Sequence, residues 1–262
     1  MLSWRGRKQF VIIILISLPF IIGGIWVVEK IIPDPSCFDG KQNQEEFGVD
    51  CGGPCMHCAL KYPKSVKVFW ARGAAGSDKR YDVVAEIENL NELLSSAEVT
   101  YEIMLSDKFG QVAKKQGKTF LFAQERILAV ETGIETSRTP TEAGFKITDV
   151  KWLLRNDIKP ALTVEEKKYE IAEEQGRRFS RIVATIANDS SFDFEQMDIA
   201  VAVFDEEENL IGASRIGVER IRSLERHEVK ILWPFELNGV PSMIRIEPRA
   251  NVFKEGTVLK PQ

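Results

Sequence analysis

The chain has 262 residues, of which 44% are hydrophobic and 28% are charged, and its formal net charge is −4. This composition is close to that of ordinary globular proteins and excludes a largely disordered or low-complexity chain. The first thirty residues carry a charge of +3, which leaves −7 for the remainder, and so acidic a remainder argues against nucleic acid as a partner.

The first predicted element is residues 10–28, a run of nineteen residues without a charged side chain. A helix of this length spans about 28 Å, close to the hydrocarbon thickness of a bilayer. The run is longer than the apolar part of a cleaved signal peptide, and no small-residue cleavage site follows it. The sequence therefore predicts a single transmembrane anchor, assigned to residues 10–30. Three basic residues precede the run, which favours a cytoplasmic N-terminus at residues 1–9 and an extracytoplasmic C-terminal region.

The second predicted element is a cysteine-rich module at residues 33–59, which holds all four cysteines of the chain. An even number of closely spaced cysteines in an exported segment favours disulfides, which replace the hydrophobic core that so short a segment lacks. The pairing stays open, because four cysteines allow three connectivities. The residues predicted to form disulfides are Cys37, Cys51, Cys55 and Cys58.

Three other kinds of site compete with disulfides in this module. Cys55 and Cys58 have the spacing of a redox pair, and four thiolates suit zinc, although an oxidising exterior favours disulfides over both. The module also contains hard oxygen ligands for calcium, although their spacing is not that of an EF-hand. These candidate calcium ligands are Asp39, Asn43, Glu46 and Asp50.

The motif C-x-D-G-x-x-N-x-x-E-x-x-x-D-C-G-G-x-C-x-x-C runs from Cys37 to Cys58. It resembles a small cysteine module that recurs in surface and secreted proteins of diverse bacteria. The resemblance covers less than a tenth of the chain, and it implies an extracellular structural module without an activity that can be transferred.

From Tyr62 onward the sequence repeats itself at a spacing near 100 residues. Residues 83–89 align with residues 182–188, and the Glu-Arg pair at 125–126 recurs at 225–226. Apolar and polar side chains alternate in both copies, which is typical of a strand with one buried face. A repeat of this length is a whole domain rather than one unit of a solenoid.

Six or seven short strands in each copy predict two tandem immunoglobulin-like antiparallel β-sandwiches, at residues 62–158 and 161–256. The chain is therefore predicted to be mainly β, with a domain boundary at residues 156–162. Residues 163–176 fit either a helix or a strand, and their place in the repeat favours a strand. Residues 72–77 are predicted to form a turn, because small residues and glycines follow one another there.

Residues 201–205 and 209–212 of the second copy read VAVFD and NLIG. They resemble the FxLYD type of bacterial surface β-sandwich repeat. The first copy has Tyr101 to Asp107 at this place and departs from the family pattern at Ser106, where an aromatic residue is usual. The resemblance implies an envelope-associated binding or spacer domain and nothing catalytic.

The sequence contains few residues that could carry catalysis. Its only histidines are His57 and His227, no Ser/His/Asp set can be built without one of them, and no phosphate-binding glycine loop is present. Paired acids for glycoside hydrolysis stay open, because such partners meet only in the fold. Three tryptophans alternate with aliphatic residues, which favours core positions over a ligand platform. They are Trp70, Trp152 and Trp233.

These patterns predict a non-catalytic, membrane-anchored extracytoplasmic protein that binds or scaffolds components of the cell envelope. Its partners are the membrane, through residues 10–28, and an unknown envelope protein or polymer, with no cofactor apart from the calcium alternative. Two other functions stay open: an accessory subunit of a membrane secretion or pilus complex, and a surface thiol or hydrolytic enzyme.

Overall fold

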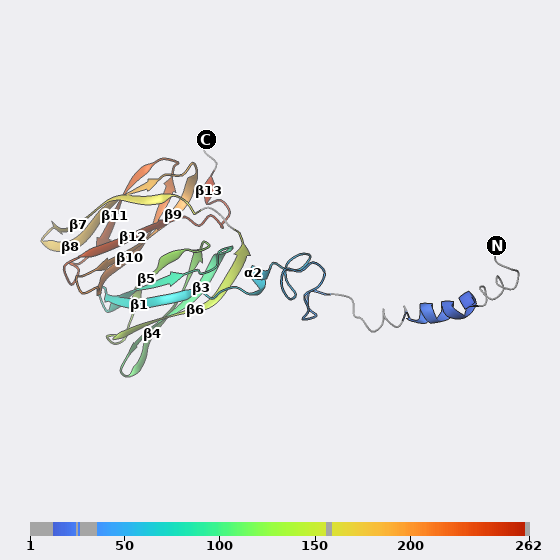
Figure 1. Cartoon of the computed structure of the whole chain (residues 1–262). Coiled ribbons are helices and arrows are strands. Elements are labelled where there is room, and N and C mark those ends of the chain that lie inside the picture. The colour runs from blue at the N-terminus through green and yellow to red at the C-terminus, as the bar shows by residue number, and fades with distance from the viewer. Residues whose placement is uncertain (1–12, 25, 27–35, 156–158, 260–262) are drawn as a thin grey trace. The chain divides into compact units, whose positions relative to one another are not determined.

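The computed structural model describes residues 13–24, 26, 36–155 and 159–259 (Figure 1). The chain forms two compact units, Met1–Lys61 and Tyr62–Gln262.

Residues 13–24 of the first unit are helical, and most of their side chains are exposed. Among the residues described, no helix is both long enough and apolar enough to cross a bilayer. The other parts of the predicted anchor, residues 10–12, 25 and 27–30, lie outside the described residues, as does the predicted cytoplasmic segment 1–9. The anchor therefore stays a prediction.

Six strands of the second unit form two antiparallel sheets, which we call the first sheet pair (Figure 1). One sheet has the order β1-β2-β5, with bounds Lys67–Ala75, Arg80–Glu88 and Arg126–Glu135. The other has the order β4-β3-β6, with bounds Gly110–Leu121, Leu94–Asp107 and Glu142–Leu154. Alternate side chains of both sheets, such as Ile87 of β2 and Ile103 of β3, form one buried hydrophobic cluster.

The remaining strands form the second sheet pair. One sheet has the order β11-β8-β7, with bounds Arg226–Trp233, Arg177–Asn188 and Leu162–Glu174. The other has the order β10-β9-β12, with bounds Leu210–Ile221, Asp193–Phe204 and Met243–Arg249, and the short β13 (Val258–Leu259) pairs with the start of β9. A second hydrophobic cluster, which includes Ile186 of β8 and Ile199 of β9, holds these two sheets together.

Two equivalent asparagines close the same kind of loop in each sheet pair. The side-chain amide of Asn89 donates to the carbonyls of Leu94 and Phe122, at 2.6 and 2.8 Å. Asn188, 99 residues further along the chain, makes the corresponding two bonds in the second pair, at 2.8 and 2.9 Å. Both side chains are fully buried, and each donates both amide hydrogens to backbone carbonyls of its loop. The internal repeat of the sequence is thus a repeat of structure.

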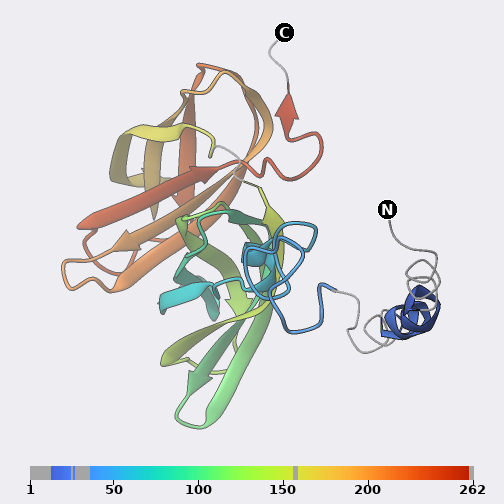
Figure 2. The same cartoon turned by 45° about the vertical axis from the view of Figure 1, so that its right-hand side comes forward.

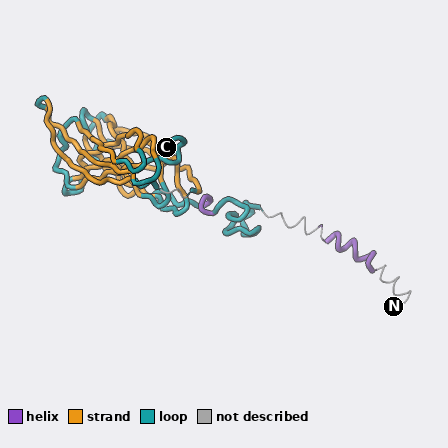
Figure 3. The backbone as a smooth tube through the Cα atoms, turned by 90° about the horizontal axis from the view of Figure 1, so that it is seen from above, coloured by secondary structure: helices purple, strands orange, loops and turns teal. Residues whose placement is uncertain are grey.

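The predicted mainly β class is confirmed, as Figure 3 shows by the dominance of strands in the second unit. Residues 163–174 lie in β7, so the strand and not the helix forms there. The predicted turn at residues 72–77 is wrong in its first part, because β1 continues to Ala75 and the chain turns at residues 76–79. Ala74 is 4% exposed and packs among buried side chains, so tertiary burial overrides the local preference for a turn.

The two sheet pairs lie side by side (Figure 2). A third hydrophobic cluster lies between them. It joins the outer face of the β1-β2-β5 sheet to residues of β9 and β10. Phe204 packs edge-on against Trp70, with ring centroids 5.9 Å apart. The members of this cluster are Ala74, Val84, Leu128, Val130, Ala200, Ala202, Phe204, Leu210 and Ala213, with Trp70 packed against them. The outer faces that the repeat pattern assigns to solvent are therefore buried over this area.

The three tryptophans have different surroundings. Trp233 is 3% exposed in the core of the second sheet pair, and its Nε1 donates to the carbonyl of Ala213 at 3.1 Å. Trp152 of β6 is half-buried. Trp70 is also half-buried and lies at the junction of the sheet pairs, so the core prediction is confirmed for Trp233 alone.

Candidate functional site

The four cysteines form two disulfides, Cys37–Cys55 and Cys51–Cys58. No cysteine is left free. Cys55 and Cys58 have redox spacing but are bonded to different partners, so they do not form the bond that a Cys-x-x-Cys redox site uses. The predicted disulfide residues are thus all paired, and the structure resolves the connectivity that the sequence leaves open.

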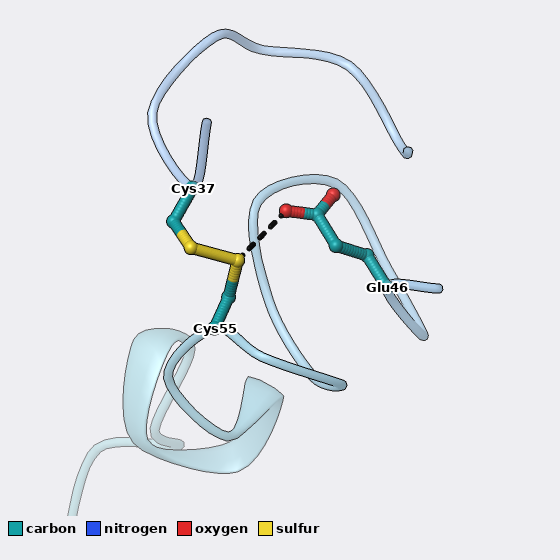
Figure 4. A group of neighbouring side chains, drawn as sticks. All are labelled: Cys37, Glu46 and Cys55. Carbon is teal, nitrogen blue, oxygen red and sulfur yellow. Dashed lines mark hydrogen bonds between the residues drawn. A yellow bond between two sulfur atoms is a disulfide. The ribbon is translucent and has the colours of Figure 1, made fainter. Parts of the chain in front are cut away.

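A buried glutamate organises the loop between the first two cysteines. The Oε2 atom of Glu46 accepts the backbone N–H groups of Asn43 and Asp50, at 3.3 and 3.0 Å, and the residue is 6% exposed. Its Oε1 atom lies 3.0 Å from Sγ of Cys55, as Figure 4 shows. That sulfur is already bonded to Cys37 and has no proton to donate, so the contact is a close approach of oxygen to sulfur. Glu46 therefore holds the loop in shape by accepting two of its backbone N–H groups from inside the module.

Two glycines allow the tight turn that follows Cys51. Gly52 and Gly53 have φ values of 81° and 57°, which residues with a side chain rarely adopt. A Cβ atom at Gly52 would lie 2.5 Å from the ring of Phe47, and one at Gly53 would lie 2.5 Å from the carbonyl oxygen of Glu45. The backbone path therefore requires glycine at both positions.

Most candidate calcium ligands already bond within the module. Asp39 accepts the side-chain amide of Asn43 at 2.8 Å, and this bond, with the backbone N–H of Lys41, lowers the pKa of Asp39. Asp50 accepts the N–H of Gly40 at 2.9 Å and pairs with Lys61 at 3.2 Å. Asp39 and Asp50 therefore stabilise the loops of the module through these bonds.

One oxygen atom of the candidate calcium ligands forms no hydrogen bond within the described residues. Oδ1 of Asn43 is buried and has no hydrogen-bond partner among the described residues. Across the described ranges, the group of potential metal-ligating side chains within 4.8 Å of one another is Cys37, Glu46 and Cys55, and both sulfurs belong to a disulfide. The structure therefore does not gather Asp39, Glu46 and Asp50 into one such group, and the calcium site stays a prediction.

The two histidines serve local roles. Nδ1 of His57 accepts the backbone N–H of Ala59 at 3.2 Å, and Nδ1 of His227 lies 3.6 Å from a carboxylate oxygen of Glu225. Neither of these contacts brings a serine or cysteine nucleophile to a histidine.

A polar pocket opens at the junction of the two sheet pairs, with a volume of about 330 Å³. Strands β3 and β4 of the first pair form one wall, and β9, β10 and β12 of the second pair form another. A smaller space of about 20 Å³ adjoins it and shares five of its lining residues. The pocket is lined by Ala97, Glu98, Lys118, Thr119, Phe120, Gln196, Asp198, Arg215, Arg249, Asn251, Lys254 and Thr257.

Arg249 anchors the pocket and links the two sheet pairs. Its Nη2 atom donates to the carbonyl of Phe120 at 2.7 Å and to Oε2 of Glu125 at 2.8 Å. Its guanidinium lies over the ring of Phe120, 4.0 Å from the centroid. Burial raises the pKa of Glu125, but the charges of Arg249 and Lys159 and the N–H of Phe122 outweigh burial and lower it. The pair is therefore ionised at neutral pH.

Arg215 lines the pocket from β10. It donates to Oδ2 of Asp198 at 2.9 Å and lies 4.0 Å from a carboxylate oxygen of Glu131. Glu131 also accepts the hydroxyl of the buried Tyr101 at 2.9 Å. Burial and the neighbouring Glu131 raise the pKa of Tyr101, so this hydroxyl stays protonated and donates. The arrangement fixes Arg215 in place.

A loop of residues 250–257 completes the pocket. Phe253 packs against Phe122 and Phe120 of the first sheet pair, with centroids 5.0 and 6.3 Å away. The carbonyl of Thr257 accepts the N–H of Glu195, which attaches the end of the loop to β9. Lys254 at the tip is exposed and has no ion pair among the described residues.

Sequence reasoning misses this pocket. Its residues come from five strands and a loop, and none forms a motif with its neighbours in the chain. The signal that is present is the basic cluster of Arg245, Arg249 and Lys254 near the end of an acidic chain. The structure brings two of these residues against the first sheet pair, Arg245 to Glu86 and Arg249 to Glu125.

A search with protein-family models gives no match, and no curated protein shows significant similarity to the chain.

Proposed function

We propose that the chain is a membrane-anchored, extracytoplasmic binding or scaffolding protein of the cell envelope, without a catalytic role. In this proposal residues 10–28 anchor the chain, the disulfide module follows as a spacer, and residues 62–158 and 161–256 are tandem immunoglobulin-like sandwiches that present a binding surface. The observation that carries the proposal is the pair of disulfides directly after the apolar segment. Structural disulfides persist in oxidising compartments outside the cytoplasm.

The sheet arrangement supports the binding role. Each sheet pair encloses its own hydrophobic cluster, as the two layers of a sandwich do, and no cysteine bridges the layers. The third cluster joins the two pairs, and the junction pocket is lined by residues of both pairs. The contacts of the two histidines include no serine or cysteine nucleophile among the described residues, and a concave site with convergent polar groups is a candidate ligand site.

Single-cysteine labelling in intact cells tests the proposed topology, because the four native cysteines are bonded. Glu206→Cys lies in the exposed turn between β9 and β10, and Ser3→Cys lies in the predicted cytoplasmic segment. A membrane-impermeant maleimide is expected to label Glu206→Cys in intact cells and Ser3→Cys after permeabilisation alone. Labelling of Ser3→Cys in intact cells, with Glu206→Cys protected, would overturn the proposal.

A further inference from the structure

The junction pocket is a positively charged concavity in an acidic protein. Four of its lining residues are cationic and two are acidic, so the lining carries a formal charge of +2. The residues beyond position 30 together carry −7. The excess of positive charge is therefore local to this pocket and favours an anionic ligand there.

Some cationic side chains of the pocket form ion pairs within the lining, whereas others do not. Lys118 bonds to Glu98 at 2.9 Å, and Arg215 bonds to Asp198 at 2.9 Å, so these two cations are largely compensated within the lining. Lys254 has no ion pair among the described residues and is exposed at the rim. It is thus available to a ligand.

Arg249 lies at the floor of the pocket, where its charge is paired with Glu125. It is 8% exposed, and its carboxylate partner, Glu125, is not part of the lining. Its Nε–H is buried and has no hydrogen-bond partner among the described residues. This Nε–H is a hydrogen-bond donor at the cavity that the ion pair with Glu125 does not use.

The remaining polar lining suits hydroxyl groups. Thr119, Thr257, Gln196 and Asn251 place hydroxyls and amides around the cavity, and such groups both donate and accept hydrogen bonds. A volume of about 330 Å³ is at the lower end of the roughly 300–1,000 Å³ of small-ligand sites. The lining therefore fits a small, anionic and hydroxyl-rich group.

We propose that this pocket binds an acidic, polyhydroxylated unit of an envelope polymer, with the anionic group between Lys254 and Arg249 and the hydroxyls on the amide and hydroxyl side chains. This inference rests on the proposed envelope-binding function, for which it names the ligand class. The anionic group is supplied by a uronic acid carboxylate or by a polyol phosphate, which have the same charge and hydroxyl chemistry.

Calorimetric titration of the full chain in detergent tests the proposal with three ligands: trigalacturonate, neutral galactotriose and a glycerol phosphate oligomer. Binding of either acidic ligand at least about tenfold tighter than the neutral one is expected, with affinity falling as salt rises. Binding of trigalacturonate would identify the anionic group as a carboxylate, and binding of the glycerol phosphate oligomer would identify it as a phosphate. Equal affinity for acidic and neutral ligands, or no binding of any ligand, would overturn the inference.

A matched pair of isosteric variants separates the pocket from general charge effects. Gln196→Glu adds one negative charge to the lining, whereas Gln111→Glu adds the same charge to an exposed position near the β3–β4 turn. Gln196→Glu is expected to weaken acidic binding at least about fivefold and Gln111→Glu to leave it within twofold. Equal effects of the two variants would overturn the pocket as the site.

A third variant, Lys254→Gln, removes the unpaired rim charge and is expected to weaken acidic binding, while Lys108→Gln at an exposed turn is expected to leave it unchanged. Full affinity in Lys254→Gln would also count against the site. Failure of these tests leaves the proposed topology standing, because cysteine labelling measures that topology independently.

Discussion

Arg249 of β12 and Glu125, which directly precedes β5, form a buried ion pair across the junction of the sheet pairs, with 2.8 Å between Nη2 and Oε2. Their side chains are 7% and 3% exposed. Glu125 also accepts the backbone N–H of Phe122 at 3.0 Å, so one carboxylate both closes a loop of the first pair and holds the second pair. The two sheet pairs are therefore coupled by a contact that water does not screen.

Arg249→Met is expected to destabilise the protein by about 3 kcal/mol, because it leaves the Glu125 carboxylate buried without its main partner. Urea denaturation followed by circular dichroism measures the change. Arg226→Met, which breaks an exposed pair with Glu165, serves as the matched control and is expected to cost less than about 1 kcal/mol. Equal costs for both variants would show that the buried pair is not special.

Asn89→Ala and Asn188→Ala are each expected to cost about 2 kcal/mol, since each removes two buried hydrogen bonds that the side-chain amide donates. Similar costs are expected because the two residues make equivalent bonds. Thermal unfolding compares them with Asn209→Ala in an exposed turn, which is expected to change stability by far less. A negligible effect of Asn89→Ala would contradict the loop-closing role.

Burial raises the pKa of Asp82, although the N–H of Gly133 bonds to it at 2.8 Å. The folded state therefore binds the proton more tightly than the unfolded state, and it loses stability as the pH rises through the raised pKa. Asp82→Asn removes this loss, so the variant is expected to be more stable than the parent at pH 7 and equal to it near pH 3. Urea midpoints at the two pH values test this, with the exposed Asp149→Asn as control. A lower midpoint for Asp82→Asn at pH 7 is the contrary result.

Paired cysteine substitutions test the disulfide connectivity. Cys37→Ser/Cys55→Ser and Cys51→Ser/Cys58→Ser each remove one whole disulfide and are expected to leave no thiol that a maleimide can label in the denatured protein. Cys37→Ser/Cys51→Ser breaks both disulfides and is expected to leave two labelled thiols. Mass spectrometry counts the labels. Two labels in either of the first variants would contradict the pairing.

The sequence by itself determines the alternation of buried and exposed side chains, and hence the strands and the repeat. Residues 83–89 and 182–188 show it, because the two-residue period is a local property of an extended backbone. It also determines that the cysteines cluster, but not their pairing, because three connectivities are compatible with the same spacing.

Only the tertiary structure decides which outer faces stay in water. Val84 and Ala202 lie on faces that a single sandwich would expose, yet both are fully buried where the sheet pairs meet. The same contact turns the predicted turn at Arg72–Ala75 into strand and brings Arg249 to Glu125, 124 residues away in the chain. Burial and charge pairing between distant segments depend on how whole sheets pack, which no local period encodes. The junction pocket is a product of that packing.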